Sequence, residues 1–92
     1  ATPELKIALA DGDKFALVEK LIEQGEYPNG KPTTIDGLRV DFAKGWGLVR
    51  ASNTSPALTL RFEAETQEAL EKIQQLFKRE LLKIDSKLAI NF

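Results

Sequence analysis

Alternation of apolar and polar residues marks out the strands of this chain. The pattern is present in residues 5–9, recurs through Leu38–Phe42, and is cleanest in residues 58–64. A period of two places every second side chain on the same face of a sheet, so each segment predicts a half-buried strand. Residues 46–51 are more apolar on both faces and predict a further strand.

Two other segments carry the spacing of amphipathic helices. The first is predicted from about Lys14 to Gln24, with Asp13 as its N-cap and Gly25 at its end. The second follows Thr66, a suitable N-cap, and extends for about 18 residues by its apolar period. Its apolar positions are spaced by three or four residues: Leu70, Ile73, Phe77, Leu81 and Ile84. Residues 85–92 are expected to form an ordered or fraying tail.

The connecting segments are rich in glycine, proline and asparagine. Residues 26–33 predict a loop, and residues 52–56 predict another. Asp36-Gly37 indicates a two-residue hairpin because glycine tolerates a positive φ. Lys44-Gly45 predicts the next turn.

The order of these elements predicts an α+β fold. We expect a mostly antiparallel four-stranded sheet with two helices on one face. The length of 92 residues fits a single domain spanning residues 1–92.

Composition narrows the classes of function. The net charge of −1 argues against a nucleic-acid binder, which needs many uncompensated cations. The sequence has no cysteine and no histidine, which excludes disulfides, thiolate or imidazole metal ligands and Ser–His nucleophiles. An independent enzyme on this chain is therefore not expected. We predict no membrane span and no signal peptide, and a cytoplasmic location suits the lack of cysteine.

One loop has chemistry suited to an anion. Residues 50–56 read Arg-Ala-Ser-Asn-Thr-Ser-Pro, so an arginine precedes a run of small hydroxyl and amide residues. Such a turn leaves backbone N–H groups accessible, and a guanidinium can bind two phosphate oxygens at once. The same composition is also typical of an ordinary strand connection, and the residues alone do not separate the two interpretations.

Other candidates favour structural roles. Trp46 could stack on a sugar or base, but a place in the core or beside the hairpin turn is the commoner reason for such a residue. Asp11 and Asp13 are interpreted as a turn and a helix cap rather than a cation site. Tyr27 indicates a mobile surface loop. The charged residues of the last helix are interpreted as a solvated face.

Residues 50–56 resemble the phosphate-binding loop of the α-D-phosphohexomutases, which has the form Arg-x-Ser-Gly/Asn-Thr-x-Pro. Residues 34–41 (TIDGLRVD), 44–50 (KGWGLVR) and 60–64 (LRFEA) resemble the bacterial phosphomannomutase/phosphoglucomutase subgroup of that family. The likeness covers nearly the whole chain, and the blocks together are specific where the loop alone is not. It implies a fold like that of the TATA-box-binding protein, as a likeness of fold only.

The resemblance implies the last of four domains. The enzymes of that family interconvert hexose 1-phosphate and hexose 6-phosphate through a bisphosphorylated sugar. A phosphoserine in the first domain transfers the phosphoryl group, an acidic loop in the second binds Mg²⁺, and the third recognises the sugar. The fourth binds phosphate and closes the cleft. The chain is thus expected to be an excised domain, inactive alone, with no metal of its own.

The expected ligand is a mannose or glucose phosphate, and the expected partners are the three preceding domains. Glucose 1,6-bisphosphate is the implied activator of the whole enzyme. The resemblance assigns Arg50, Ser52, Asn53 and Thr54 to the phosphate. Many relatives have an arginine where Thr59 stands, so no phosphate contact is expected from residue 59. The alternative is a stand-alone ligand- or protein-binding module without catalytic activity.

Overall fold

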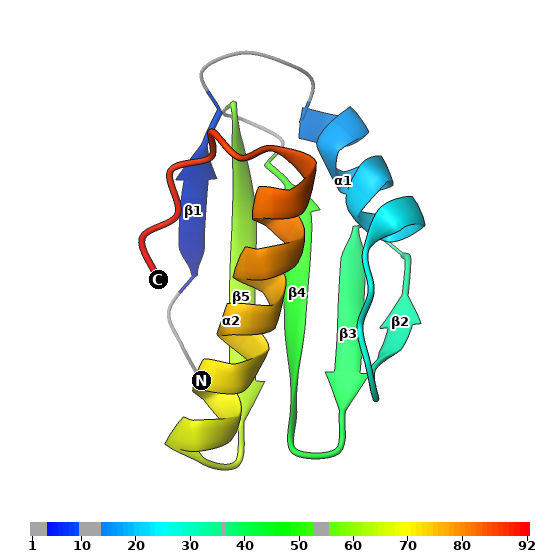
Figure 1. Ribbon diagram of the computed structural model, residues 1–92, viewed down its shortest axis with the longest axis vertical. Helices are drawn as coiled ribbons and strands as arrows, with labels where there is room; N and C mark the ends of the chain where they lie inside the picture. The colour runs from blue at the N-terminus through cyan, green and yellow to red at the C-terminus, as the bar shows by residue number, and fades with distance from the viewer. Residues whose placement is uncertain (1–3, 10–13, 36, 53–55) are drawn as a thin grey trace.

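An antiparallel sheet with two helices against one face makes up the described part of the chain (Figure 1). The structure is a computed structural model that describes residues 4–9, 14–35, 37–52 and 56–92. Its strands pair in the order β1-β5-β4-β3-β2, and every neighbouring pair is antiparallel. In chain order the elements are β1 (Leu5–Ala8), α1 (Lys14–Gln24), β2 (Lys31–Thr33), β3 (Leu38–Phe42), β4 (Gly45–Ala51), β5 (Ala57–Ala64) and α2 (Gln67–Ile84). The predicted α+β class is confirmed.

The sheet has five strands where the sequence predicted four. The additional strand, β2, is three residues long and exposed at every position. It therefore has no alternation of apolar and polar residues from which a strand could be predicted. It pairs only with β3, and Pro32 is tolerated there because an edge strand needs no N–H donor on its free side. A hairpin joins β2 and β3 where Asp36-Gly37 predicted one, but the predicted two-residue connection is wrong, since residues 34–37 separate the strands. Asp36 itself lies outside the described residues.

Both helices cover the same face of the sheet, as predicted. α1 contacts β3 and β4, while α2 contacts β4 and β5. The core between the layers is apolar, and burying one such side chain fully contributes about 1.5–3 kcal/mol. Its fully buried side chains include Ile7, Leu21, Leu38, Val40, Val49, Leu58, Leu60, Phe62, Phe77 and Leu81.

Gly47 lets α2 approach the sheet closely. A Cβ at this position would lie 2.6 Å from the Phe77 ring and 3.1 Å from the Phe62 ring. Those two rings pack edge to face with centroids 5.4 Å apart. The absence of a side chain at Gly47 therefore makes room for this aromatic contact between helix and sheet.

Residues close in sequence determine where each helix begins or ends. The Thr66 hydroxyl accepts a hydrogen bond from the Ala69 N–H at 3.1 Å, which confirms it as the N-cap of α2. α1 ends at Gln24, and the Gly25 N–H still donates to the Leu21 carbonyl at 3.1 Å. The predicted cap Asp13 lies outside the described residues. The tail packs on the core through Leu88, Ile90 and Phe92.

One charged residue of α2 is buried. Glu80 is 1% exposed, although its helix position suggested a solvated face. Its carboxylate accepts hydrogen bonds from the Glu26 N–H at 2.9 Å and from Arg79 at 3.0 Å, and it pairs with Lys83 at 2.7 Å. The interpretation of every charged residue on α2 as solvated is therefore wrong for Glu80, which ties α2 to the segment after α1.

Candidate functional site

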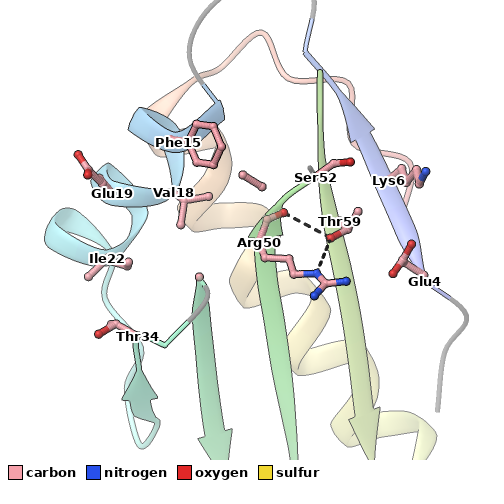
Figure 2. Close-up of a pocket in the computed structure, with 12 residues that line it drawn as sticks. Glu4, Lys6, Phe15, Val18, Glu19, Ile22, Thr34, Arg50, Ser52 and Thr59 are labelled. Atoms are coloured by element: carbon pink, nitrogen blue, oxygen red, sulfur yellow. Dashed lines mark hydrogen bonds between the residues drawn. The ribbon is translucent and has the colours of Figure 1, made fainter. Parts of the chain in front are cut away.

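A pocket lies at the end of the sheet where β4 stops and β5 begins. Its volume is about 740 Å³, and its lining comes from β1, β4, β5, α1 and the β2–β3 connection. Figure 2 shows Arg50 and Thr59 on the strands, with Phe15 and Val18 on the helix across from them. Elements far apart in sequence therefore meet beside Arg50 and Ser52.

Of the two predicted site residues that the structure describes, Arg50 is the one that lies on a strand. It is exposed, near the end of β4, and pairs with Thr59 of β5 in the antiparallel ladder. Its Nε donates to the Thr59 hydroxyl oxygen at 3.4 Å, and that hydroxyl donates to the Arg50 carbonyl oxygen, also at 3.4 Å (Figure 2). Within the described part of the chain, no carboxylate forms an ion pair with Arg50.

Ser52 anchors the start of the connection after β4. It is buried, lines the pocket, and its N–H donates to the Ala57 carbonyl at 2.9 Å. Its own carbonyl accepts a hydrogen bond from Lys14 Nζ of α1. The base of the loop is thus fixed both to β5 and to α1. Asn53 and Thr54, the other two predicted ligands, lie outside the described residues.

Gly37 brings the β2–β3 connection against Arg50. Its φ of +117° lies in a region that L residues rarely adopt. A Cβ there would lie 2.4 Å from the Val49 carbonyl oxygen and 2.8 Å from the Arg50 Cβ. Sequence reasoning assigned Gly37 only to a turn, whereas its close approach to the β4 backbone shapes one wall of the pocket.

The charge around the pocket is balanced. Lys6 and Arg50 contribute cations, while Glu4 and Glu19 contribute carboxylates. The opposite wall is apolar and includes Phe15, which is 57% exposed. The balance of charge means that any attraction for an anion would be local to the Arg50 guanidinium, and the apolar wall could face an uncharged part of the same ligand.

The other candidates take structural positions. Trp46 lies on the sheet face opposite the core, and the Arg39 guanidinium stacks 4.5 Å from its ring centroid. It lines a shallow hollow beside the β3–β4 turn, so the turn interpretation is confirmed and the core interpretation is wrong. Asp11 and Asp13 lie outside the described residues.

Tyr27 lies in the irregular segment after α1, as predicted, but its side chain is half-buried and packs against the core. Its hydroxyl donates to the Leu21 carbonyl at 2.9 Å, and its ring lies 5.7 Å from that of Phe77. Burial, with a smaller contribution from the charge of Glu80, raises the pKa of the phenol well above its usual range. The phenol is therefore held in its neutral form near neutral pH.

The described residues show neither a metal-binding cluster nor a membrane-spanning helix. Among residues 4–9, 14–35, 37–52 and 56–92, no cluster of three or more histidine, cysteine or acidic side chains could hold a metal ion. In the same part of the chain, neither helix combines the length and apolar character needed to cross a membrane.

Comparison with known proteins places these features in one family. A family model described as the phosphoglucomutase/phosphomannomutase C-terminal domain matches residues 4–80. The chain is 50% identical over all 92 residues to a phosphomannomutase/phosphoglucomutase of Pseudomonas aeruginosa, covering 20% of that protein. It is 52% identical over 80 residues to a phosphoglucomutase of Neisseria meningitidis serogroup B, covering 85% of the chain and 17% of the relative.

A solved structure agrees with the sequence matches. A phosphoglucomutase/phosphomannomutase family protein from Burkholderia thailandensis superimposes with a TM-score of 0.88 at 38% identity. The superposition covers 99% of this chain and 19% of the other. The chain thus spans about a fifth of the length of the proteins it matches.

Proposed function

We propose that this chain, which belongs to the phosphoglucomutase/phosphomannomutase family as its C-terminal domain, binds the substrate phosphate and closes the active-site cleft. The enzyme it serves would interconvert hexose 1-phosphate and hexose 6-phosphate of mannose or glucose. That reaction would pass through a bisphosphorylated sugar. The chemistry itself would take place on the three preceding domains of the same polypeptide.

The observation that carries the proposal is the meeting of Arg50 and Ser52 in one pocket. Arg50 offers a guanidinium to that pocket, and no carboxylate of the described residues neutralises it by an ion pair. Ser52 is fixed at the start of the connecting loop by its bonds to Ala57 and Lys14. A cation beside the anchored first residue of the connection suits a phosphate group better than it suits a neutral ligand.

Such a site answers a requirement of the proposed reaction. A bisphosphorylated intermediate must turn over so that either phosphate can face the phosphoserine. The phosphate that is not reacting then needs a binding site that makes few contacts with the sugar. Binding energy at this remote group can orient the reacting one, and closure of the domain would exclude water from the phosphoenzyme.

The remaining parts of the proposal lie outside this chain. Mg²⁺ would be bound by a preceding domain, where it would neutralise charge on the transferring phosphoryl group. Glucose 1,6-bisphosphate would act as activator of the whole enzyme in the cytoplasm. We expect the 92-residue chain alone to convert no glucose 1-phosphate to glucose 6-phosphate, as followed by ³¹P NMR.

A titration tests phosphate binding directly. Inorganic phosphate and glucose 1-phosphate should shift the backbone amide signals of residues 52–55 of the ¹⁵N-labelled chain, whereas glucose should not. Arg50→Ala should remove the shifts. Arg61→Ala is the matched control because Arg61 is exposed on the same face of the sheet, and it should leave them intact. Amide signals that stay in place at high phosphate concentration would refute the proposal.

A further inference from the structure

Thr59 sits between two cations in a row that crosses the sheet. The ladder pairs it with Lys6 of β1 on one side and with Arg50 of β4 on the other. Thr59 is 7% exposed, which is unusual for a polar residue on the sheet face that the helices leave open. We infer that Thr59 is a positioning residue that orients the Arg50 guanidinium for the anion, an inference that rests on the proposed function above.

The hydrogen bonds fix the direction of each group. The Thr59 hydroxyl donates its proton to the Arg50 carbonyl oxygen, so its lone pairs are free to accept from Arg50 Nε. This arrangement uses the Nε–H of the guanidinium inside the protein. The edge formed by the two terminal nitrogens is left for the ligand, and that edge can bind two oxygens of one phosphate.

A neutral partner preserves the charge that the site needs. A carboxylate at residue 59 would also orient the arginine, but it would cancel the positive charge that attracts an anion. A threonine hydroxyl orients the guanidinium and leaves its positive charge unneutralised. Its β-branched side chain has a restricted χ1, so the oxygen that accepts from Nε is itself held in place.

Among the described strand neighbours of Arg50, Thr59 is the one whose side chain orients the guanidinium. On the β3 side the adjacent residue is Gly37, which has no side chain and lies against the Arg50 backbone. On the β5 side, the Thr59 hydroxyl is the one hydrogen-bond partner of the guanidinium among the described residues. A long arginine side chain loses considerable rotamer freedom when it binds, so orienting it beforehand should strengthen binding.

The test compares Thr59→Val with Thr59→Ser in the 92-residue chain. Valine keeps the shape and removes the hydroxyl, while serine keeps the hydroxyl. We expect Thr59→Val to weaken inorganic phosphate binding about three- to tenfold, the range of one lost hydrogen bond. Thr59→Ser should stay within about twofold of the unaltered chain on the same scale. The ¹⁵N–¹H signal of Arg50 Nε should show fast motion in Thr59→Val only.

The outcomes separate this inference from the proposed function. Phosphate binding by Thr59→Val equal to that of the unaltered chain would overturn the positioning role and leave the phosphate site standing. Equal weakening in both variants would overturn it too, because the hydroxyl would then be irrelevant. If the unaltered chain does not bind phosphate, the proposed function fails. The Arg50 Nε signal then decides by itself whether Thr59 orders the arginine side chain.

Discussion

The Glu80 carboxylate accepts a hydrogen bond from the backbone N–H of Glu26, 54 residues earlier in the chain, at 2.9 Å. This contact joins the C-terminal half of α2 to the segment that follows α1. Lys83 and Arg79 complete the shell around the carboxylate, so the buried charge is paired on several sides. A buried charge with partners is tolerated, but removing part of the set is costly.

Replacement of this carboxylate should destabilise the fold. Glu80→Gln keeps the size of the side chain but loses both ion pairs, and we expect a loss of about 1–3 kcal/mol in the free energy of unfolding. Urea unfolding measures the change. Glu68→Gln is the control because its pair with Lys72 is almost fully exposed, at 79% and 77%, and should cost less than about 0.5 kcal/mol. Equal effects of the two substitutions would contradict the structural role of Glu80.

The same carboxylate should make stability depend on pH. Burial alone would raise the pKa of Glu80, but the hydrogen bonds from Lys83, the Glu26 N–H and Arg79 outweigh burial and hold the pKa below its ordinary value of 4.5. Its contribution to stability is therefore present above about pH 4.5 and lost as pH falls through the lowered pKa. Urea midpoints from pH 7 to pH 3 should converge for the unaltered chain and Glu80→Gln. A constant gap across that range would count against this prediction.

Tyr27 offers a second titration that can be read without a label. It is the only tyrosine in the sequence, and burial raises the pKa of its hydroxyl far above 10. Because the folded state favours the neutral phenol, Tyr27 contributes to the free energy of unfolding. This contribution is fully present below the unfolded pKa of 10.0 and is lost as the pH rises from there through the folded pKa. Absorbance near 295 nm should therefore stay flat through pH 10 and rise only with loss of the circular dichroism signal. A simple titration near pH 10 in the folded chain would show that the hydroxyl is solvated.

Substitution of Gly37 should disturb both stability and the site. Gly37→Ala forces a Cβ to within 2.4 Å of the Val49 carbonyl oxygen at a positive φ, and we expect a cost of about 2 kcal/mol or more. Because the same Cβ would press on Arg50, phosphate binding should weaken as well. Ile35→Ala is the control in the same connection, since Ile35 is 77% exposed. Urea midpoints and the phosphate titration check both effects, and an unchanged midpoint for Gly37→Ala would disprove the close approach.

Lys14 should support the loop from the helix side. Its Nζ donates to the Ser52 carbonyl, so Lys14→Met keeps most of the aliphatic stem and removes the donor. We expect faster hydrogen exchange at the Ser52 amide and phosphate binding weakened about two- to fivefold. Lys20→Met, an exposed lysine of the same helix, serves as the matched control. Identical exchange rates in the two variants would show that Lys14 does not hold the loop.

Much of the fold is determined by the sequence alone. The strands β1, β3, β4 and β5 and both helices follow from periods of two and of three to four residues, because those periods record which side of an element meets the core. The Thr66 cap and the end of α1 also follow from the sequence, because each depends on residues within one helical turn. The motif at residues 50–56, taken together with the blocks at residues 34–41, 44–50 and 60–64, indicates the family, although half of the predicted ligands lie outside the described residues.

Tertiary structure decided what periodicity cannot record. β2 exists because β3 offers it a partner, and its own three exposed residues carry no pattern. Glu80 is buried because the segment after α1 covers it and supplies an N–H. The partnership of Thr59 with Arg50 comes from the register of β4 against β5, which joins residues nine positions apart. A local pattern says which way a side chain faces, and only the packed sheet says what it meets there.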